Sequence, residues 1–323
     1  FRRVLFRSGV EVDMMGNTIH NWDMLERGYT MHHAISQDKQ GNILATVSKT
    51  SAKIANGKDV RINDFIIMMD PEKGEILQEW DLVHMLDSAR YGMTDYDLTS
   101  DPFAQSASNW AHNNGIVEWG DDYLATARYQ GIFKFNKAGG IEWIISPHGY
   151  WRDKYLKLLL NPLHADGTPI TDPEVIAGTK TCDDFEWPWG CHTAVPLPNG
   201  HILYFNNGYG RNFKLDFTDR KNIYTCGIEY EVDEVNRTVR QVWQYGKERG
   251  AAYFTPARSG VQYLEQTGNR LICPGMSNVL SNGNRGARVT EVDPETQDVV
   301  FELELEDAIY QRVYRMSLYP ENQ

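Results

Sequence analysis

Three histidines occur at the same position of a repeated sequence pattern. His33, His112 and His192 are each followed, eight residues later, by a turn glycine and then by an apolar stretch. Along the chain they are separated by 79 and 80 residues. A neutral imidazole ring can serve as a nucleophile, a general acid or base, a hydrogen-bond donor or a metal ligand. If the repeated units close around an axis, the three rings converge on one small volume.

Two more polar residues belong to this pattern. Arg128 follows the second predicted strand of the unit that contains His112, so it lies one strand further out. Asn114 lies two residues beyond His112 and therefore points to the same side of its strand. A guanidinium group offers a rigid fork of donors that suits sulfate or phosphate. Histidine, arginine and asparagine in this arrangement favour a site for an oxyanion.

Two other interpretations stay open. The three imidazoles can bind a divalent metal, as in a metal-dependent lyase or oxygenase. Against this, no carboxylate is aligned with them in the pattern, and a guanidinium group repels a cation. The histidines can also be structural hydrogen-bonding residues of a ligand-binding protein without catalytic activity.

The sequence predicts four repeated units of four strands each. The strands are expected at 31–37, 43–49, 65–69 and 76–82; at 114–118, 123–128, 131–135 and 141–145; at 193–197, 202–205, 227–232 and 239–245; and at 260–264, 270–273, 287–292 and 299–305. The outer strands carry a matching large residue, namely Trp80, Trp143, Trp243 and Phe301. Such units are typical of a β-propeller, in which each sheet buries its faces only by stacking on the next.

In a propeller the first strand of each blade lines the central channel, which places the three histidines near the axis. The fourth unit has no histidine, and Gly260 takes the aligned place. Two long insertions, 81–111 and 146–190, precede histidine-bearing strands and are expected to build the rim of the channel. Residues 151–160 are expected to form a short helix. Residues 10–22 are expected to end an earlier unit, and 309–319 to supply a strand of a further blade.

The composition excludes some partners. The chain has 323 residues and a formal net charge of −12, without a long basic run, which argues against nucleic acid as a partner. No run of eighteen apolar residues exists, so no membrane span is predicted. The four cysteines form no Cys-x-x-Cys pair, which argues against a structural zinc site.

The N-terminus has an unusual sequence. Residues 1–8, FRRVLFRS, read as a sequencing adaptor translated in frame and not as native protein. We therefore expect a non-native segment at 1–8, followed at 9–323 by a β-propeller domain that is incomplete at its N-terminus.

Several ordered motifs resemble those of the bacterial arylsulfate sulfotransferases. They are His32-His33-Ala34-Ile35-Ser36, Asn109-Trp110-Ala111-His112-x-Asn114, Arg128-Tyr129-Gln130, Asp184-Phe185-Glu186-Trp187-x-Trp189-x-x-His192-Thr193-Ala194, and Trp243-x-Tyr245-Gly246-Lys247-Glu248-Arg249-Gly250. The resemblance extends over nearly all of the chain after the first eight residues. It implies a six-bladed propeller that moves a sulfuryl group from one phenol to another without a nucleotide sulfate donor.

The resemblance also implies a role for each candidate residue. His192 corresponds to the transiently sulfurylated histidine of a ping-pong mechanism, and His112, Asn114 and Arg128 correspond to the sulfuryl-binding group. His33 corresponds to the histidine that handles the phenolic proton, with His32 as the fallback. The implied partners are small aryl sulfates and phenols, without a cofactor or a metal. The resemblance further implies a periplasmic or secreted homodimer.

The cysteines depart from the family pattern. A short disulfide precedes the nucleophile motif in the family, and Cys182 fits one end of it, but the other end falls near Ile176. Cys191 also stands where glutamine is expected. Either Cys182 pairs with Cys191 or both are free.

Overall fold

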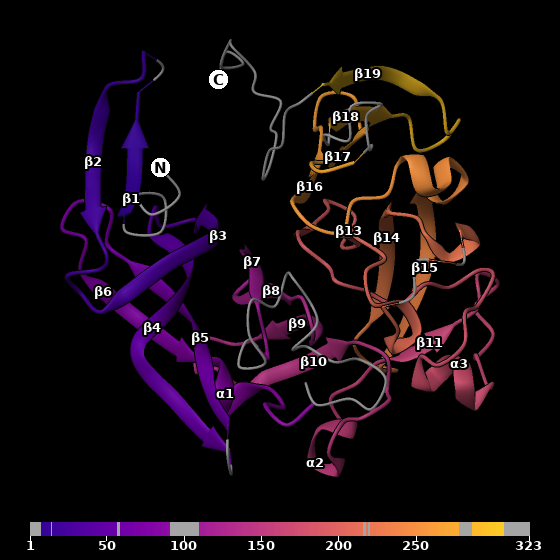
Figure 1. The fold of residues 1–323 in the computed structure, drawn as a ribbon, viewed down its shortest axis with the longest axis horizontal. Coiled ribbons are helices and arrows are strands. Elements are labelled where there is room, and N and C mark those ends of the chain that lie inside the picture. Colours follow the sequence, from indigo (N-terminus) through magenta and orange to yellow (C-terminus); the bar gives the residue numbers. More distant parts are fainter. Residues whose placement is uncertain are drawn as a thin grey trace.

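The structure, a computed structural model, describes residues 8–13, 15–56, 59–90, 110–215, 218, 220–277 and 286–306. Most elements in these residues are β-strands, and the helices are short. Four antiparallel sheets follow one another around an arc (Figure 1). The all-β class and the four-stranded repeat predicted from the sequence are confirmed for this part of the chain.

Each sheet, here called a blade, uses its strands in chain order. Blade 1 contains β3 (Tyr29–Gln37), β4 (Ile43–Asn56), β5 (Asp59–Met69) and β6 (Ile76–Asp81). Blade 2 contains β7 (Asn113–Trp119), β8 (Asp122–Ala127), β9 (Gly131–Phe135) and β10 (Ile141–Ile145). Blade 3 contains β12 (Ala194–Pro196), β13 (Ile202–Asn206), β14 (Cys226–Asp233) and β15 (Thr238–Tyr245). Blade 4 contains β16 (Ser259–Tyr263), β17 (Arg270–Pro274), β18 (Ala287–Val292) and β19 (Val299–Leu305).

The blades pack face against face. Every residue of β13 and β17 is buried. One face of β13 packs against the second insertion and the other against blade 4. The first strands meet in the interior, where β7 contacts both β3 and β12. Between blades 1 and 2, Ser36 Oγ donates a hydrogen bond of 2.7 Å to the carbonyl oxygen of Ile116. This stacking is the β-propeller arrangement, with four blades in the described residues.

A tryptophan on the outer strand of each of the first three blades is hydrogen-bonded to the next blade. Trp80 Nε1 donates to the carbonyl of Lys137 at 3.0 Å, and Trp143 Nε1 donates to Glu234 Oε1 at 2.8 Å. The Gln297 amide is oriented so that its nitrogen and its oxygen both have hydrogen-bond partners, and the oxygen then accepts from Trp243 Nε1 at 2.7 Å. Each acceptor lies in the turn between the third and fourth strands of the following blade. Three of the four outer-strand residues predicted to match therefore make equivalent bonds, which we call the tryptophan ladder. The fourth, Phe301, has no N–H to donate.

The N-terminal hairpin belongs to this ladder. It consists of β1 (Ser8–Val12) and β2 (Thr18–Asp23). Trp22 Nε1 donates at 2.8 Å to the carbonyl of Pro71, in the equivalent turn of blade 1. Trp22 thus bonds forward to blade 1 as Trp80 bonds to blade 2, and the strands predicted around the Gly16-Asn17 turn are confirmed. Of the first eight residues, only Ser8 is described.

The insertions are more irregular than predicted. The first contains α1 (Leu82–Met85), and the second contains α2 (Asp153–Leu156), β11 (Asn161–Leu163) and α3 (Pro173–Ala177). The helix expected at 151–160 is only one turn long, because Leu158 and Leu160 bond instead to the backbone of Ile144 on β10. β11 then adds a parallel fifth strand beside β15. The strand expected at 309–319 lies outside the described residues.

No helix in the described part of the chain combines the length and the apolar character that crossing a membrane requires.

Candidate active site

The structure brings the three histidines of the repeat together in the interior of the arc. His33 lies on β3, His112 directly before β7, and His192 two residues before β12. Nε2 of His33 and Nε2 of His112 are 3.2 Å apart. The ring centres of His33 and His192 are separated by 6.1 Å. Equivalent positions on three successive blades therefore place three imidazoles within one another's reach.

Two of these histidines have backbone dihedral angles that differ from those of a β-strand. His33 has φ 56° and His112 has φ 53°, in the left-handed region that side chains other than glycine rarely adopt. Each lies at an irregularity in the pairing of the first strand with the second, between Met31 and Ile35 in blade 1 and next to Asn113 in blade 2. Bulges of this kind re-aim side chains near functional sites, and such strain costs about 1–3 kcal/mol.

A hydrogen bond fixes the protonation pattern of His192. Its Nδ1 lies 2.6 Å from Asn207 Oδ1. The amide nitrogen of Asn207 donates at 2.7 Å to the carbonyl of Thr255, so the amide oxygen must face the imidazole. Nδ1 therefore carries the hydrogen, and Nε2 has the lone pair. The backbone N–H of Arg258 points at this lone pair from 3.2 Å.

Arg128 is held beside the histidines by its backbone and by its side chain. Its N–H donates at 2.9 Å to the carbonyl of His112, and its Nη2 donates at 2.9 Å to the carbonyl of Pro256. The guanidinium group is buried and lies 4.6 Å from the ring centre of Tyr209. A buried cation is thereby placed between blades 2, 3 and 4.

Asn114 faces the next blade. Its Nδ2 donates at 2.9 Å to the carbonyl of Cys191, the residue before His192. The irregular pairing beside Asn113 breaks the simple alternation along β7. Asn114 therefore contacts the backbone segment that carries His192.

Behind His33 lies a buried carboxylate that the repeat did not reveal. Nδ1 of His32 is 2.9 Å from Nδ1 of His33, and Nε2 of His32 is 3.4 Å from Asp64 Oδ1. Asp64, on β5, also accepts from the N–H of Asn113 at 3.0 Å and from Ser48 Oγ at 2.8 Å. Burial acts to raise the pKa of Asp64, but His32 and these donors hold it below 3.8. His32 thus links an ionised carboxylate to His33.

The environment keeps two of the histidines neutral. Desolvation is the largest cause that lowers the pKa of His112 well below 6.5, and the charge of Arg128 is the next. The pKa of His33 is also lowered well below 6.5, by desolvation and then by His112, His32, His192 and Arg128. Solvent still reaches the His33 ring, which weakens the desolvation contribution, but the neighbouring imidazoles and Arg128 act in the same direction.

Blade 4 has an arginine at the position of the histidines. Arg258 precedes β16 as His112 precedes β7, and it has φ 61°. Its carbonyl accepts from the N–H of Gly275 at 2.7 Å, as the carbonyl of His112 accepts from Arg128. Arg258 lies ten residues before the turn glycine Gly268, whereas His112 lies eight residues before Gly120, so counting eight residues back from the glycine led to Gly260. The alignment of Gly260 with the histidines is therefore wrong.

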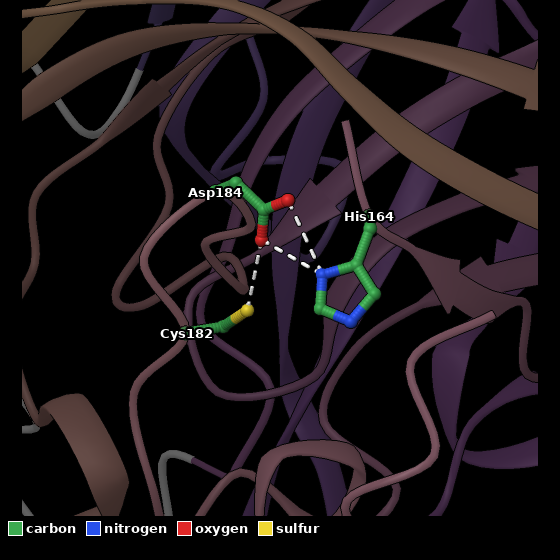
Figure 2. Close-up of side chains that lie close together, drawn as sticks. All are labelled: His164, Cys182 and Asp184. Carbon is green, nitrogen blue, oxygen red and sulfur yellow. Dashed lines mark hydrogen bonds and ion pairs between the residues drawn. The ribbon is translucent and has the colours of Figure 1, made fainter. Parts of the chain in front are cut away.

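No disulfide joins any of the four cysteines in the described part of the chain, so Cys182 and Cys191 are not bonded to each other. Cys191 is buried, and desolvation raises the pKa of its thiol to about 12, which makes it unreactive. Cys182 is partly exposed, and its Sγ lies 3.1 Å from Asp184 Oδ1 (Figure 2).

Several polar or aromatic side chains near the second insertion have structural roles. Trp187 and Trp189 lie in the hydrophobic core beside the second insertion. Arg211 donates from Nε to Glu186 at 2.7 Å, and both side chains are buried. In contrast, Tyr209 borders the site through its contact with Arg128.

Stacked four-stranded blades with polar residues gathered at their inner strands define a β-propeller with a central candidate active site. The family model for arylsulfotransferases matches residues 5–315, so the chain belongs to the arylsulfotransferase family. The resemblance inferred from the motifs is confirmed.

Two curated relatives are both called arylsulfate sulfotransferase. The one from Escherichia coli O6:H1 is 29% identical over 95% of this chain, and the one from Lelliottia amnigena is 30% identical over 95%. The chain spans 56% of the length of each relative.

Similar solved structures include BamB from Moraxella catarrhalis, at 8% identity and a TM-score of 0.34, covering 96% of this chain and 84% of that one. The Dos1 propeller has 10% identity and a TM-score of 0.34, and covers 85% of this chain and 62% of that one. At such scores the fold assignment rests on the four sheets themselves.

Proposed function

We propose that this protein transfers a sulfuryl group from an aryl sulfate to a phenolic acceptor by a ping-pong mechanism through a sulfohistidine at His192. The observation that carries the proposal is the fixed tautomer of His192, which presents an unprotonated Nε2 beside a buried guanidinium group. Membership of the arylsulfotransferase family supports the substrate class.

In the first half-reaction, the lone pair of His192 Nε2 attacks the sulfur of the aryl sulfate. The N–S bond forms as the bond between sulfur and the aryl oxygen breaks, and the electron pair leaves with the phenolate. The hydrogen on Nδ1 stays in its bond to Asn207 Oδ1, which supports the positive charge that develops on the ring. The backbone N–H of Arg258 must release Nε2 when the substrate enters.

Arg128, His112 and Asn114 are proposed to bind the sulfuryl oxygens. The guanidinium group provides several donors in a rigid plane, and a neutral imidazole provides one N–H. One amide hydrogen of Asn114 bonds to the carbonyl of Cys191, and the same nitrogen carries a second hydrogen that can donate to a sulfuryl oxygen. Prearranged donors of this type stabilise the charge of the transition state, and the loss of one typically costs about 3–4 kcal/mol of barrier.

His33 is proposed to transfer the phenolic proton. In the free site its pKa is depressed by its neighbours. A bound sulfate ester brings a negative charge that favours the protonated ring, so substrate binding itself prepares the acid. His33 gives its proton to the departing phenolate and takes one from the incoming phenol, whose oxygen then attacks the sulfur and breaks the N–S bond.

The metal alternative is less well supported. In the described residues the ligand atoms of the three histidines do not gather closely enough for a three-ligand metal site. The buried guanidinium group of Arg128 would also repel a divalent cation at this position.

The resemblance supplies three further parts of the proposal. They are a six-bladed ring that includes the four described blades, a periplasmic or secreted location, and a homodimer. The exposed Phe301 and Leu303 lie on one face of β19 and support a further blade, because a sheet stacked on that face would bury both side chains.

The test combines kinetics with a trapped intermediate. The protein is incubated with a nitrophenyl sulfate, and the peptide that contains His192 is examined by mass spectrometry under alkaline conditions. We expect one added sulfuryl group, its loss when phenol is added, and parallel lines in double-reciprocal plots. His192→Asn should abolish both the label and the transfer. Transfer that continues in this variant, or a label on another residue, would contradict the proposal.

A further inference from the structure

Outside the histidine cluster, three side chains of different chemistry converge in the second insertion (Figure 2). Nδ1 of His164 lies 3.0 Å from Asp184 Oδ1, and Sγ of Cys182 lies 3.1 Å from the same oxygen. The three potential ligand atoms all lie within 4.8 Å of one another. In the described part of the chain, this is the one group of three such residues.

The cluster is held in place from both sides. His164 follows β11, in a tight turn where its N–H donates to the carbonyl of Thr168 at 2.8 Å. Asp184 precedes Phe185, whose ring is buried and stacks on Tyr230. The second carboxylate oxygen of Asp184 accepts from the N–H of Ala165 at 3.0 Å, which orients the first oxygen toward Cys182 and His164.

The chemistry of the three ligands fits a borderline-soft divalent cation. An imidazole nitrogen, a thiolate and a carboxylate are the three ligand types that bind Zn²⁺ in proteins. With bonds of about 2.0–2.3 Å, ligand atoms around tetrahedral zinc lie about 3.3–3.8 Å apart, so a small expansion of the cluster accommodates the ion. One thiolate and one carboxylate neutralise the charge of the cation.

The exposure of the cluster and the charges around it also allow a cation to bind. The side chains of His164 and Asp184 are about two-fifths exposed, at 40% and 38%, so a cation can enter from solvent. The nearby Arg240, which donates to the carbonyl of Ala165, has its charge balanced by Glu231.

We propose that His164, Cys182 and Asp184 form a three-ligand site for a zinc-type divalent cation, with a fourth position open to solvent. On binding, the Cys182 thiol releases its proton to solvent, and His164 keeps its hydrogen on Nε2 so that Nδ1 can bind the metal. The bound ion connects the turn after β11 to the segment that precedes His192 in the chain. The motif escaped sequence analysis because its members lie 18 and 2 residues apart without a Cys-x-x-Cys pair.

Cobalt titration of the chelator-treated protein tests this site. Co²⁺ should bind with one equivalent and produce the sulfur-to-cobalt charge-transfer absorption and the intense visible bands of a four-coordinate ion. Cys182→Ser should remove the charge-transfer absorption. His164→Gln and Asp184→Asn should each weaken binding at least about tenfold, since even the loss of groups that only orient a metal ligand costs roughly 10–100-fold.

Asp183→Asn is the matched control, because Asp183 is an exposed carboxylate next to the cluster and should leave the titration unchanged. A second measurement needs no variant. Cys182 is the partly exposed cysteine, whereas Cys191, Cys226 and Cys273 are buried, so stoichiometric Zn²⁺ should slow alkylation at Cys182. Unchanged alkylation, or cobalt bands that survive Cys182→Ser, would overturn the proposal. Neither readout depends on sulfuryl transfer, so the proposed function is tested separately.

Discussion

Asn207 Oδ1 accepts the hydrogen of His192 Nδ1 across 2.6 Å, and the rest of the Asn207 amide is fixed by the carbonyl of Thr255. This pair links the residue that follows the second strand of blade 3 to the residue proposed as the nucleophile. It also decides which imidazole nitrogen is available for chemistry.

Replacement of Asn207 by leucine should therefore reduce kcat. The loss of tautomer control over a catalytic histidine costs up to about 10⁴-fold in serine hydrolases, and we expect at least about 10²-fold here. Asn207→Asp is the matched control, since a carboxylate still accepts from Nδ1, and it should retain more activity than Asn207→Leu. Equal activity of the two variants in steady-state assays would show that the amide does not set the tautomer.

Arg128 offers a test of the sulfuryl-binding group. Arg128→Lys keeps the positive charge but loses the planar fork and the bond to Pro256. We expect kcat/KM for aryl sulfates to fall by about 10²–10³-fold, the cost of one oxyanion donor. The fall should be larger for poor leaving groups, where more charge develops in the transition state. A variant with wild-type kcat/KM across a series of leaving groups would remove Arg128 from the site.

Asp64→Asn should lower the free energy of unfolding by about 1–3 kcal/mol at neutral pH. The buried carboxylate accepts several hydrogen bonds, and an uncharged amide accepts them less well. The pKa of Asp64 is lower in the folded state than 3.8, so its contribution is present above about pH 3.8 and is lost as the pH falls through the folded-state value. Urea unfolding at several pH values measures the difference. Asp121→Asn, at an exposed turn, is the control and should show no such dependence.

The neutral histidines predict a loss of stability in mild acid. Because the folded-state pKa of His112 lies well below 6.5, the unfolded chain takes up its proton first as the pH drops. Stability should therefore decrease below about pH 6.5, and His112→Gln should flatten this part of the profile. His84→Gln, at an exposed position, should leave the slope unchanged. If the slope of His112→Gln equals that of the wild type, His112 is not held neutral.

The tryptophan ladder can be tested one bond at a time. Trp80→Phe keeps the aromatic ring but removes the bond to Lys137, and we expect a loss of about 1 kcal/mol in the free energy of unfolding. The control is Trp119→Phe, because no bond to the Trp119 indole nitrogen appears in the part of the chain that the structure describes. Thermal unfolding that is equally affected in both variants would assign the loss to packing alone.

The repeat was sufficient to predict the blades. The limits of β9 and β10 coincide with the predicted ranges 131–135 and 141–145, because polar turns and apolar strands alternate clearly there. The matching tryptophans were also visible, although their bonds to the next blade depend on how blades stack and have no signal within one unit.

The sequence could not predict how the backbone turns at the site. The positive φ of His33 and His112 exists because strand pairing and neighbouring blades enforce it, and no local residue preference favours it. Asp64 lies on the third strand of blade 1 and Asn207 directly follows the second strand of blade 3. There a period-2 pattern describes burial but not which partner a polar side chain meets. Arg258 was missed because a longer turn shifted the count of residues in the fourth unit.

The tryptophan ladder gives the assembly a direction. Every indole reaches forward to the following blade, and the first link begins at Trp22, before blade 1. Three of the blade-to-blade interfaces that the ladder connects are also the interfaces across which His33, His112, His192 and Arg258 must meet. The placement of the proposed catalytic groups therefore depends on contacts at the periphery of the propeller. Weakening one of these outer contacts should change the distance between two of the histidine rings at the centre.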